Sequence, residues 1–309
     1  MAIAHMIEWY ENPQVRKSEL GVTYQNRVFR NLDGTTRIVG IWDQTIQTGR
    51  TPQGLYYGTE YTEEMINAAL RSEDPLQIVP SVDTDGHGTF VASAAAGGAE
   101  VGKRFLGAAP EASIAMVKLK PAKNYLKEFF AIAQDAVCYQ ENDIMLGLRY
   151  LNDLARKQGM PLVICVALGT SFGGHNGDSL LADILDIYAT VRNRCVVVGT
   201  GNEAARRHHY FNRFTDAQDM RTAEIRVGEE TQSFAVELWS TLPNIVMVSV
   251  TSPSGERTGM IPIRLGYLFD FLFTFERTTI TVEYRLLQEN NDAQLVFICL
   301  LYTFRAHET

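Results

Sequence analysis

The apolar residues of the first two thirds of the chain gather in short, unbroken runs that are separated by helical patterns. These runs are Arg37–Ile41, Ser113–Leu119, Leu162–Leu168 and Cys195–Val198. Strands that are apolar at every position are buried on both faces, which is typical of a parallel sheet covered by helices. The segments 143–158 and 178–193 repeat their apolar residues at helical spacing. This part of the chain therefore predicts an α/β fold.

After about residue 210 the pattern changes to short β-rich runs separated by turns. The runs are 222–227, 233–238, 245–250, 278–286 and 293–303. Several alternate, so that apolar residues share one face of a strand, as do Phe234, Val236 and Leu238 and, in a second run, Ile280, Val282 and Tyr284. We expect an all-β jelly-roll or sandwich module here.

The two patterns predict two domains, an α/β core over 1–209 and a β module over 210–309. An aromatic stripe at period two, from Tyr267 to Phe275, fits the core of that module. If the stripe were instead exposed on one sheet face, the module could bind carbohydrate on its own.

Composition and charge exclude several partner classes. Among the 309 residues, 36 are Asp or Glu and 28 are Lys or Arg, so the formal charge is −8. Such a surface repels phosphate backbones and anionic lipids, so neither nucleic acid nor membrane is an expected partner. No apolar run approaches the roughly 18–20 residues that cross a bilayer, and the segment 1–11 does not resemble a signal peptide.

No metal or cofactor site is predicted. The cysteines Cys138, Cys165, Cys195 and Cys299 are scattered, and no histidine stands at ligand spacing. Cys165 and Cys195 lie in apolar runs and are expected to be buried. Asp83 and Asp85 could bind calcium, but they lack the alternating oxygen ligands of a dedicated loop, so calcium is not claimed.

The most specific motif is the segment 83–93, in which His87 stands between Gly86 and Gly88. A run of small residues follows at 92–98, so the imidazole should lie where a helix begins and packs closely on a sheet. Such a histidine can accept a proton from a nucleophile. The alternative is a structural, hydrogen-bonded histidine.

Two further residues stand at strand ends, where open α/β sheets place their functional groups. Asp43 follows the run that ends at Trp42, and an acid there can orient an imidazole. Asn202 follows Val196–Val198 and a glycine-rich turn, where its amide could stabilise an oxyanion. The alternative for each is a residue that merely caps a turn.

The order of these motifs resembles the subtilisin-like serine endopeptidases (subtilases, family S8). The matching segments are the strand ending in Asp43, then Asp85-Gly-His87-Gly-Thr, Gly107-Ala-Ala-Pro110 and Thr200-Gly-Asn202-Glu. Three others resemble the clostridial, germination-specific Csp-type subtilases, which carry an inserted jelly roll: Trp42-Asp-Gln-Thr-Ile46, Ser171-Phe-Gly-Gly-His-Asn-Gly-Asp-Ser179 and Arg207-His-His-Tyr210. The resemblance implies a three-layer fold with a parallel sheet and helices on both faces.

The resemblance also implies roles for single residues. Asp43 would orient the imidazole, His87 would act as general base and Asn202 would stabilise the oxyanion. The stretch Ala167, Leu168 and Gly169 would lie along a protein or peptide substrate. The chain's own propeptide or a C-terminal segment would be a further partner, and a cytoplasmic or spore-associated location is favoured.

The sequence departs from the family pattern at two places. Asp43 is followed by Gln44 and Thr45 where the family usually has Ser or Thr and then Gly. The nucleophile motif Gly-Thr-Ser-x-Ala is absent after the module. The triplet that ends at Ser171 resembles this motif, but it precedes Asn202. It is followed by Phe-Gly-Gly, which cannot begin the required helix. Ser254 is a turn residue by its neighbours.

We therefore expect a fragment of a serine endopeptidase that ends before its nucleophile and is inactive alone. The alternative is a pseudoprotease, a subtilase fold that binds or signals without catalysis.

Overall fold

The computed structural model describes residues 2–7, 21–100, 103–130, 132–202, 207–228, 231, 233–287 and 293–302, with the backbone alone for 2–7, 287 and 302. The chain forms two compact units, and neither is a single continuous segment. The first consists of Met1–Lys123, Asp135–Thr170 and Leu180–Gly201, and the second of Asn124–Gln134, Ser171–Ser179 and Asn202–Thr309. A domain boundary at residue 210 stays a prediction.

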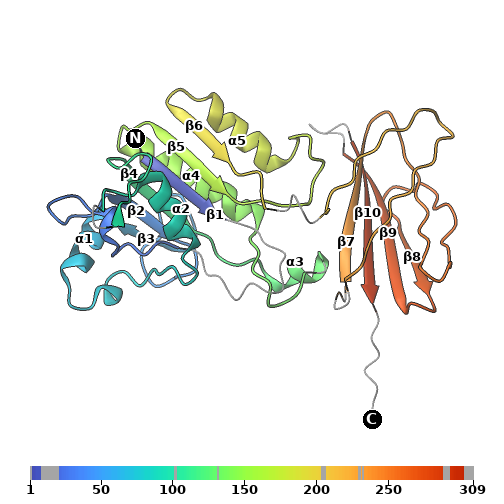
Figure 1. The fold of residues 1–309 in the computed structure, drawn as a ribbon, viewed down its shortest axis with the longest axis horizontal. Coiled ribbons are helices and arrows are strands. Elements are labelled where there is room, and N and C mark those ends of the chain that lie inside the picture. Colours follow the sequence, from blue (N-terminus) through green and yellow to red (C-terminus); the bar gives the residue numbers. More distant parts are fainter. Residues whose placement is uncertain are drawn as a thin grey trace, which may run out of the picture. The chain divides into compact units, whose positions relative to one another are not determined.

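A six-stranded sheet forms the centre of the first unit, in the order β3-β2-β4-β1-β5-β6 (Figure 1). Its strands are β1 (Ala2–Ile7), β2 (Ile38–Asp43), β3 (Thr59–Thr62), β4 (Ser113–Lys118), β5 (Leu162–Ala167) and β6 (Arg194–Val198). All neighbours pair in parallel except β2 with β3. The four strands predicted from apolar runs are confirmed, and the carboxyl ends of all parallel strands lie at one edge.

Helices cover both faces of this sheet, as the resemblance implied. They are α1 (Glu63–Arg71), α2 (His87–Ala96), α4 (Glu141–Lys157) and α5 (Leu180–Thr190), with the short 3₁₀ helices η1 (Arg27–Phe29) and η2 (Pro75–Gln77). One buried core joins α4 and α5 to the sheet, and another joins α1 and α2 to it. Neighbouring strand residues alternate between the cores, since Ile41 belongs to the second and Trp42 to the first. The predicted α/β architecture is confirmed.

The start of α2 is held by a close backbone contact that only glycine permits. A Cβ atom added at Gly88 would lie 2.1 Å from the carbonyl oxygen of Gly21, and one added at Gly21 would lie 2.4 Å from that of Val82. Beside this contact, the backbone N–H of Thr23 donates to Thr89 Oγ1 at 2.8 Å. The segment around Gly21 therefore fixes where α2 begins.

The end of α2 is fixed by a buried guanidinium. Arg37 is 8% exposed and donates to the carbonyl oxygens of Val28 at 2.6 Å, Ala96 at 2.5 Å and Ala112 at 2.8 Å. Ala96 is the last residue of α2, where helix carbonyls lack partners within the helix. Burial lowers the pKa of Arg37. Both ends of α2 are thus determined by residues from the strands and turns around it.

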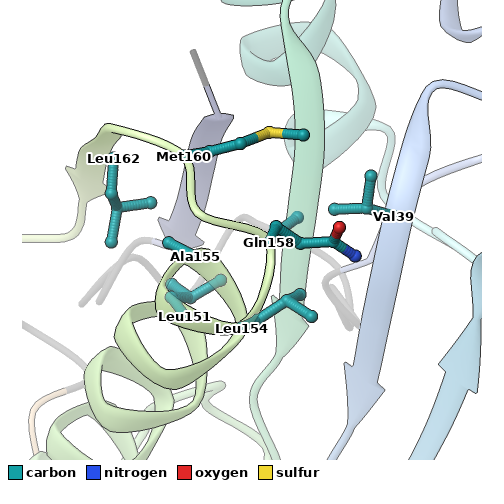
Figure 2. A pocket seen from close by; sticks show the side chains of 8 residues that line it. Val39, Leu151, Leu154, Ala155, Gln158, Met160 and Leu162 are labelled. Carbon is teal, nitrogen blue, oxygen red and sulfur yellow. The ribbon is translucent and has the colours of Figure 1, made fainter.

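A small apolar hollow lies between α4 and the sheet (Figure 2). Its lining includes Val39 near the start of β2, Leu151 and Leu154 on α4, and Leu162 at the start of β5. These strand positions are at the amino ends of β2 and β5. The hollow therefore belongs to the edge of the sheet opposite to Asp43.

The second unit contains an antiparallel sheet in the order β7-β10-β9-β8. Its strands are β7 (Ser233–Thr241), β8 (Leu268–Phe273), β9 (Thr278–Leu287) and β10 (Ala293–Tyr302), and the short helix α3 (Asn124–Phe129) belongs to the same unit. The register pairs Ile298 with Val236 on one side and with Val282 on the other. The predicted face-sharing residues of β7 and β9 therefore lie on one face, which is consistent with a β module. From the aromatic stripe, Phe273 is buried, whereas Tyr267 and Phe275 are exposed.

Two predicted strands of this unit are wrong. Residues 222–227 form no strand, and Ile225 and Val227 remain exposed, so no burial supports their β propensity. Residues 245–250 form no strand of the sheet either. The amide side chain of Gln294 accepts from Val246 N at 2.7 Å and donates to Val246 O at 3.1 Å, which takes the place of a strand partner.

On the other face of this sheet, two segments that precede the module in sequence contact β7 and β10. Phe129 stacks on Phe297 of β10 with ring centroids 5.8 Å apart, and Phe130 packs on Phe172 at 5.4 Å. The backbone N–H of Gly173 donates to Glu237 Oε2 at 2.7 Å. These contacts explain why 124–134 and 171–179 belong to the second unit.

All four cysteines are free thiols. Cys138 is buried, and burial raises the pKa of the half-buried thiols Cys165 and Cys299. The prediction that Cys195 is buried is wrong, because β6 is an edge strand and Cys195 is exposed on it, as is Val197. Within the described ranges, no helix combines the length and apolar character that crossing a bilayer requires.

We expect Gly88→Ala to lower the free energy of unfolding by about 1–3 kcal/mol, because the added methyl group overlaps the Gly21 carbonyl. Urea denaturation measures the change. Gly199→Ala is the matched control, since its Cβ would meet Val166 O at an ordinary 3.8 Å, and it should stay within about 1 kcal/mol of the parent chain. Equal stability of both variants would contradict the tight contact.

Candidate active site

Asp43 is a completely buried carboxylate at the carboxyl end of β2. Its Oδ1 accepts from the backbone N–H of Thr45 at 2.8 Å and from the Thr45 hydroxyl at 2.5 Å. Its Oδ2 accepts from the hydroxyl of Ser81 at 2.7 Å. A carboxylate removed from water needs such donors to stay ionised. The site therefore begins with an acid whose two oxygens have fixed partners.

A buried cation faces the same carboxylate. Lys118, the last residue of β4, is the register partner of Asp43, and its Nζ lies 3.9 Å from Asp43 Oδ2. On the other side, β3 brings Tyr61 near. Burial raises the pKa of Tyr61 to about 12, and the charge of Asp43 adds to this effect. The phenol therefore stays neutral at physiological pH.

His87 is the first residue of α2, as the small-residue motif predicted. Gly86 precedes it with φ +88°, a left-handed conformation that suits glycine. The carboxylate of Asp83 accepts from Gly86 N at 2.8 Å, from Thr89 N at 2.8 Å and from Thr89 Oγ1 at 2.6 Å. Asp83 thus anchors the first turn of the helix that carries the half-buried His87.

The loop before α2 connects Asp43 to the helix that carries His87. Ser81 donates to Asp43, and Asp83, two residues further on, anchors the helix of His87. Because the two contacts come from one short segment, the acid and the start of the helix cannot shift independently.

The predicted substrate stretch lies beside the glycine-rich turn that leads to Asn202. Leu168 is buried, and Ala167 and Gly169 are half-buried at the end of β5. Gly199 N donates to Val166 O at 3.0 Å, and a Cβ on Gly169 would meet Gly201 Cα at 3.6 Å. Asn202 is exposed and follows Gly201 directly as the first residue of that part of the second unit. Convergence of Asp43, His87 and Asn202 on one cleft stays a prediction.

Gln44, the departure from the family pattern, is fully buried and links three elements. Its Nε2 donates to the carbonyl oxygen of Asp143 at 3.0 Å, and its Oε1 accepts from Lys120 N at 3.2 Å. Gln44 N in turn donates to Lys118 O at 2.9 Å. The larger amide therefore ties the end of β2 to α4 and to the segment after β4.

A buried polar network surrounds this amide. The Asp143 carboxylate forms an ion pair with Lys120 and accepts from Tyr57 Oη at 2.5 Å and Gln140 Nε2 at 3.1 Å. The Lys120 ammonium lies over the Tyr57 ring, 3.9 Å from its centroid. Burial, with the hydrogen bond to Asp143 added, raises the pKa of Tyr57 far above its ordinary value. Tyr57 therefore remains a donor at any physiological pH.

Ser254 and Ser171, the two serines considered as nucleophiles, both belong to the second unit. Ser254 lies in a turn, in which Gly255 N donates to Ser252 O at 3.0 Å. Ser171 is exposed in the second unit. His175 stacks on His209 with ring centroids 4.6 Å apart. In the described part of the chain, no three His, Cys, Asp or Glu side chains gather so as to hold a metal ion.

Sequence reasoning missed Ser81, Lys118 and the buried role of Gln44. One indication was present, because Lys118 is a charged residue in the otherwise apolar run Ser113–Leu119. A lysine in a strand that is buried on both faces needs a negative partner. No comparable indication in the sequence pointed to Ser81, since a serine shortly before the motif 83–93 is an ordinary loop residue.

Comparison with known proteins shows the family. The model of the Subtilase family (Peptidase S8) matches residues 34–258, more than half of the chain. The chain therefore belongs to the subtilase family, a family of serine peptidases, and the resemblance seen in the motifs is confirmed.

Among solved structures, the chain is similar to the CspB protease of Clostridium perfringens, with 27% sequence identity and a TM-score of 0.78. The similarity covers 99% of this chain and 58% of that protein. The chain thus spans less than two thirds of the length of its structural relative. No curated protein matches.

We expect Gln44→Ser, which brings in a residue type that the family usually has here, to destabilise this chain. The shorter side chain leaves the Asp143 carbonyl and the Lys120 N–H unsatisfied, which should cost about 2–4 kcal/mol of unfolding free energy. The same substitution at exposed Gln53 is the control and should change it by less than about 0.5 kcal/mol. Chemical denaturation of both variants measures the difference, and a Gln44→Ser chain of parental stability would refute the role of the amide.

Proposed function

We propose that this chain carries the acid, the base and the oxyanion donor of a serine endopeptidase. The observation that supports this most is the buried Asp43 carboxylate, which is bonded through Ser81 to the loop that anchors the helix of His87. An acid that is fixed in this way can hold an imidazole in one tautomer and stabilise its cation. Membership of the subtilase family supplies the reaction class.

The proposed reaction is the hydrolysis of a peptide bond in two steps. A serine Oγ attacks the carbonyl carbon while His87 takes its proton, and His87 then gives that proton to the departing amine. Water then attacks the carbonyl carbon of the acyl-enzyme while His87 takes its proton. His87 gives that proton to the serine Oγ as the ester bond breaks, and the carboxylic acid is released. The Asn202 amide stabilises the oxyanion in both steps, an interaction typically worth about 3–4 kcal/mol. The serine comes from outside these 309 residues.

The proposed substrate is an extended segment of a protein. It pairs with the end of β5 at Ala167, Leu168 and Gly169 by backbone hydrogen bonds. Backbone hydrogen bonds do not depend on the identity of the side chains, so substrates of many sequences can pair in this way. A propeptide or C-terminal segment of the same protein could occupy this stretch in the same way.

The test uses the encoded protein that contains this chain together with the sequence that follows it, labelled with a serine-directed fluorophosphonate. We expect labelling in the extended protein and none in the 309-residue chain. His87→Ala should abolish labelling, because the serine loses its base, and Asp43→Asn should slow it by about 10⁴-fold.

His208→Ala is the matched control, since it removes an exposed histidine, and it should leave the rate of labelling unchanged. A folded extended protein that is not labelled would overturn the endopeptidase and favour the pseudoprotease. Labelling that survives His87→Ala would overturn the assigned base.

A further inference from the structure

Lys118 is a buried cation for which the proposed reaction has no assigned role. The residue is 3% exposed at the end of β4. Burying an ammonium is costly unless a negative charge and hydrogen-bond acceptors compensate it. Such a residue at the functional edge of a parallel sheet therefore needs an explanation.

The contacts of Lys118 reach both parts of the site. Its Nζ lies 3.9 Å from Asp43 Oδ2 and donates to the carbonyl oxygen of Val82 at 3.2 Å. Val82 stands between Ser81, which bonds Asp43, and Asp83, which anchors the helix of His87. Lys118 thus joins the strand of the acid to the loop that leads to the base.

We propose that Lys118 is a positioning residue that sets the charge balance of the Asp43–His87 pair. This inference rests on the proposed function. With Lys118 charged, the ion pair with Asp43 is already neutral when the imidazole is neutral, so a proton on His87 adds an uncompensated positive charge. Lys118 therefore favours the neutral imidazole, which is the form that can act as a base.

In the described part of the chain, the other groups that contact the Asp43 carboxylate are uncharged. Tyr61 approaches Asp43 from β3 and is neutral at physiological pH, while Thr45 and Ser81 bring hydroxyl groups. The loop before α2 carries two acids: Asp83, whose carboxylate binds the first turn of the helix, and Asp85, which is exposed. Among the described contacts of Asp43, Lys118 therefore supplies the positive charge.

The test follows the titration of His87 by NMR in the 309-residue chain, with its signal assigned by His87→Gln. Lys118→Met keeps the length of the side chain and removes the charge, so the imidazole should titrate about 0.5–1 pH unit higher than in the parent chain. Lys118→Arg keeps the charge and should remain within about 0.2 unit. An unchanged midpoint in Lys118→Met would reduce Lys118 to a structural residue.

A second variant keeps the proposal testable if Lys118→Met does not fold. Lys118→Gln removes the charge but can still donate to Val82 O, so it should shift the titration as Met does; a parental midpoint would overturn the proposal.

The failure of this inference is distinguishable from that of the proposed function. In the extended protein, the acid limb of kcat/KM should move to higher pH in Lys118→Met by the same amount as the titration. If the parent does not hydrolyse peptides, the endopeptidase proposal fails, whereas the NMR shift can still be observed. If hydrolysis persists without any shift in either measurement, only the role of Lys118 is lost.

Discussion

The structure of the site follows from one constraint, which is that the carboxylate of Asp43 is shielded completely from water. A buried negative charge must recover by internal contacts the free energy that hydration would have supplied. Here the contacts come from Thr45 on the same turn, Ser81 on the loop before α2, and Lys118 on the neighbouring strand. The contact with the Asp43 carboxylate helps to hold each of these segments in place. The geometry of this edge of the sheet is therefore linked to the electrostatics of one buried charge.

The position of His87 is determined by a different kind of force, namely close packing around α2. The backbone contact between Gly21 and Gly88 limits where the helix begins, and Arg37 binds the carbonyl groups at and near its end. None of these three residues takes part in the proposed chemistry. They lie on segments that are far apart in sequence, so the position of the helix that carries His87 depends on packing among residues between 21 and 112.

The parts of the fold that were predictable are those where one residue pattern has one physical explanation. Unbroken apolar runs predicted β2, β4, β5 and β6, because such runs are typical of strands in a parallel sheet that is covered by helices, although β6 lies at the sheet edge and exposes Cys195 and Val197. The strand predicted at 245–250 is wrong because a single side chain, Gln294, takes the pairing groups of Val246, and no pattern in 245–250 reveals this. For the site, motif order predicted roles for Asp43, His87 and Asn202, and these roles stay predictions. The contacts of Ser81, Gln44 and Lys118 depend on tertiary packing, which local sequence does not encode.

The contacts that segments 124–134 and 171–179 make with β7 and β10 have a consequence for folding during synthesis and for grafting of the sheet. Phe297 packs on Phe129, and Glu237 binds Gly173, yet Phe129 and Gly173 are synthesised well before either strand. The segments 124–134 and 171–179 are therefore synthesised before the strands that they contact. A transplant of this sheet into another host would have to carry three separate stretches of polypeptide, because the last stretch alone would expose an aromatic face to water.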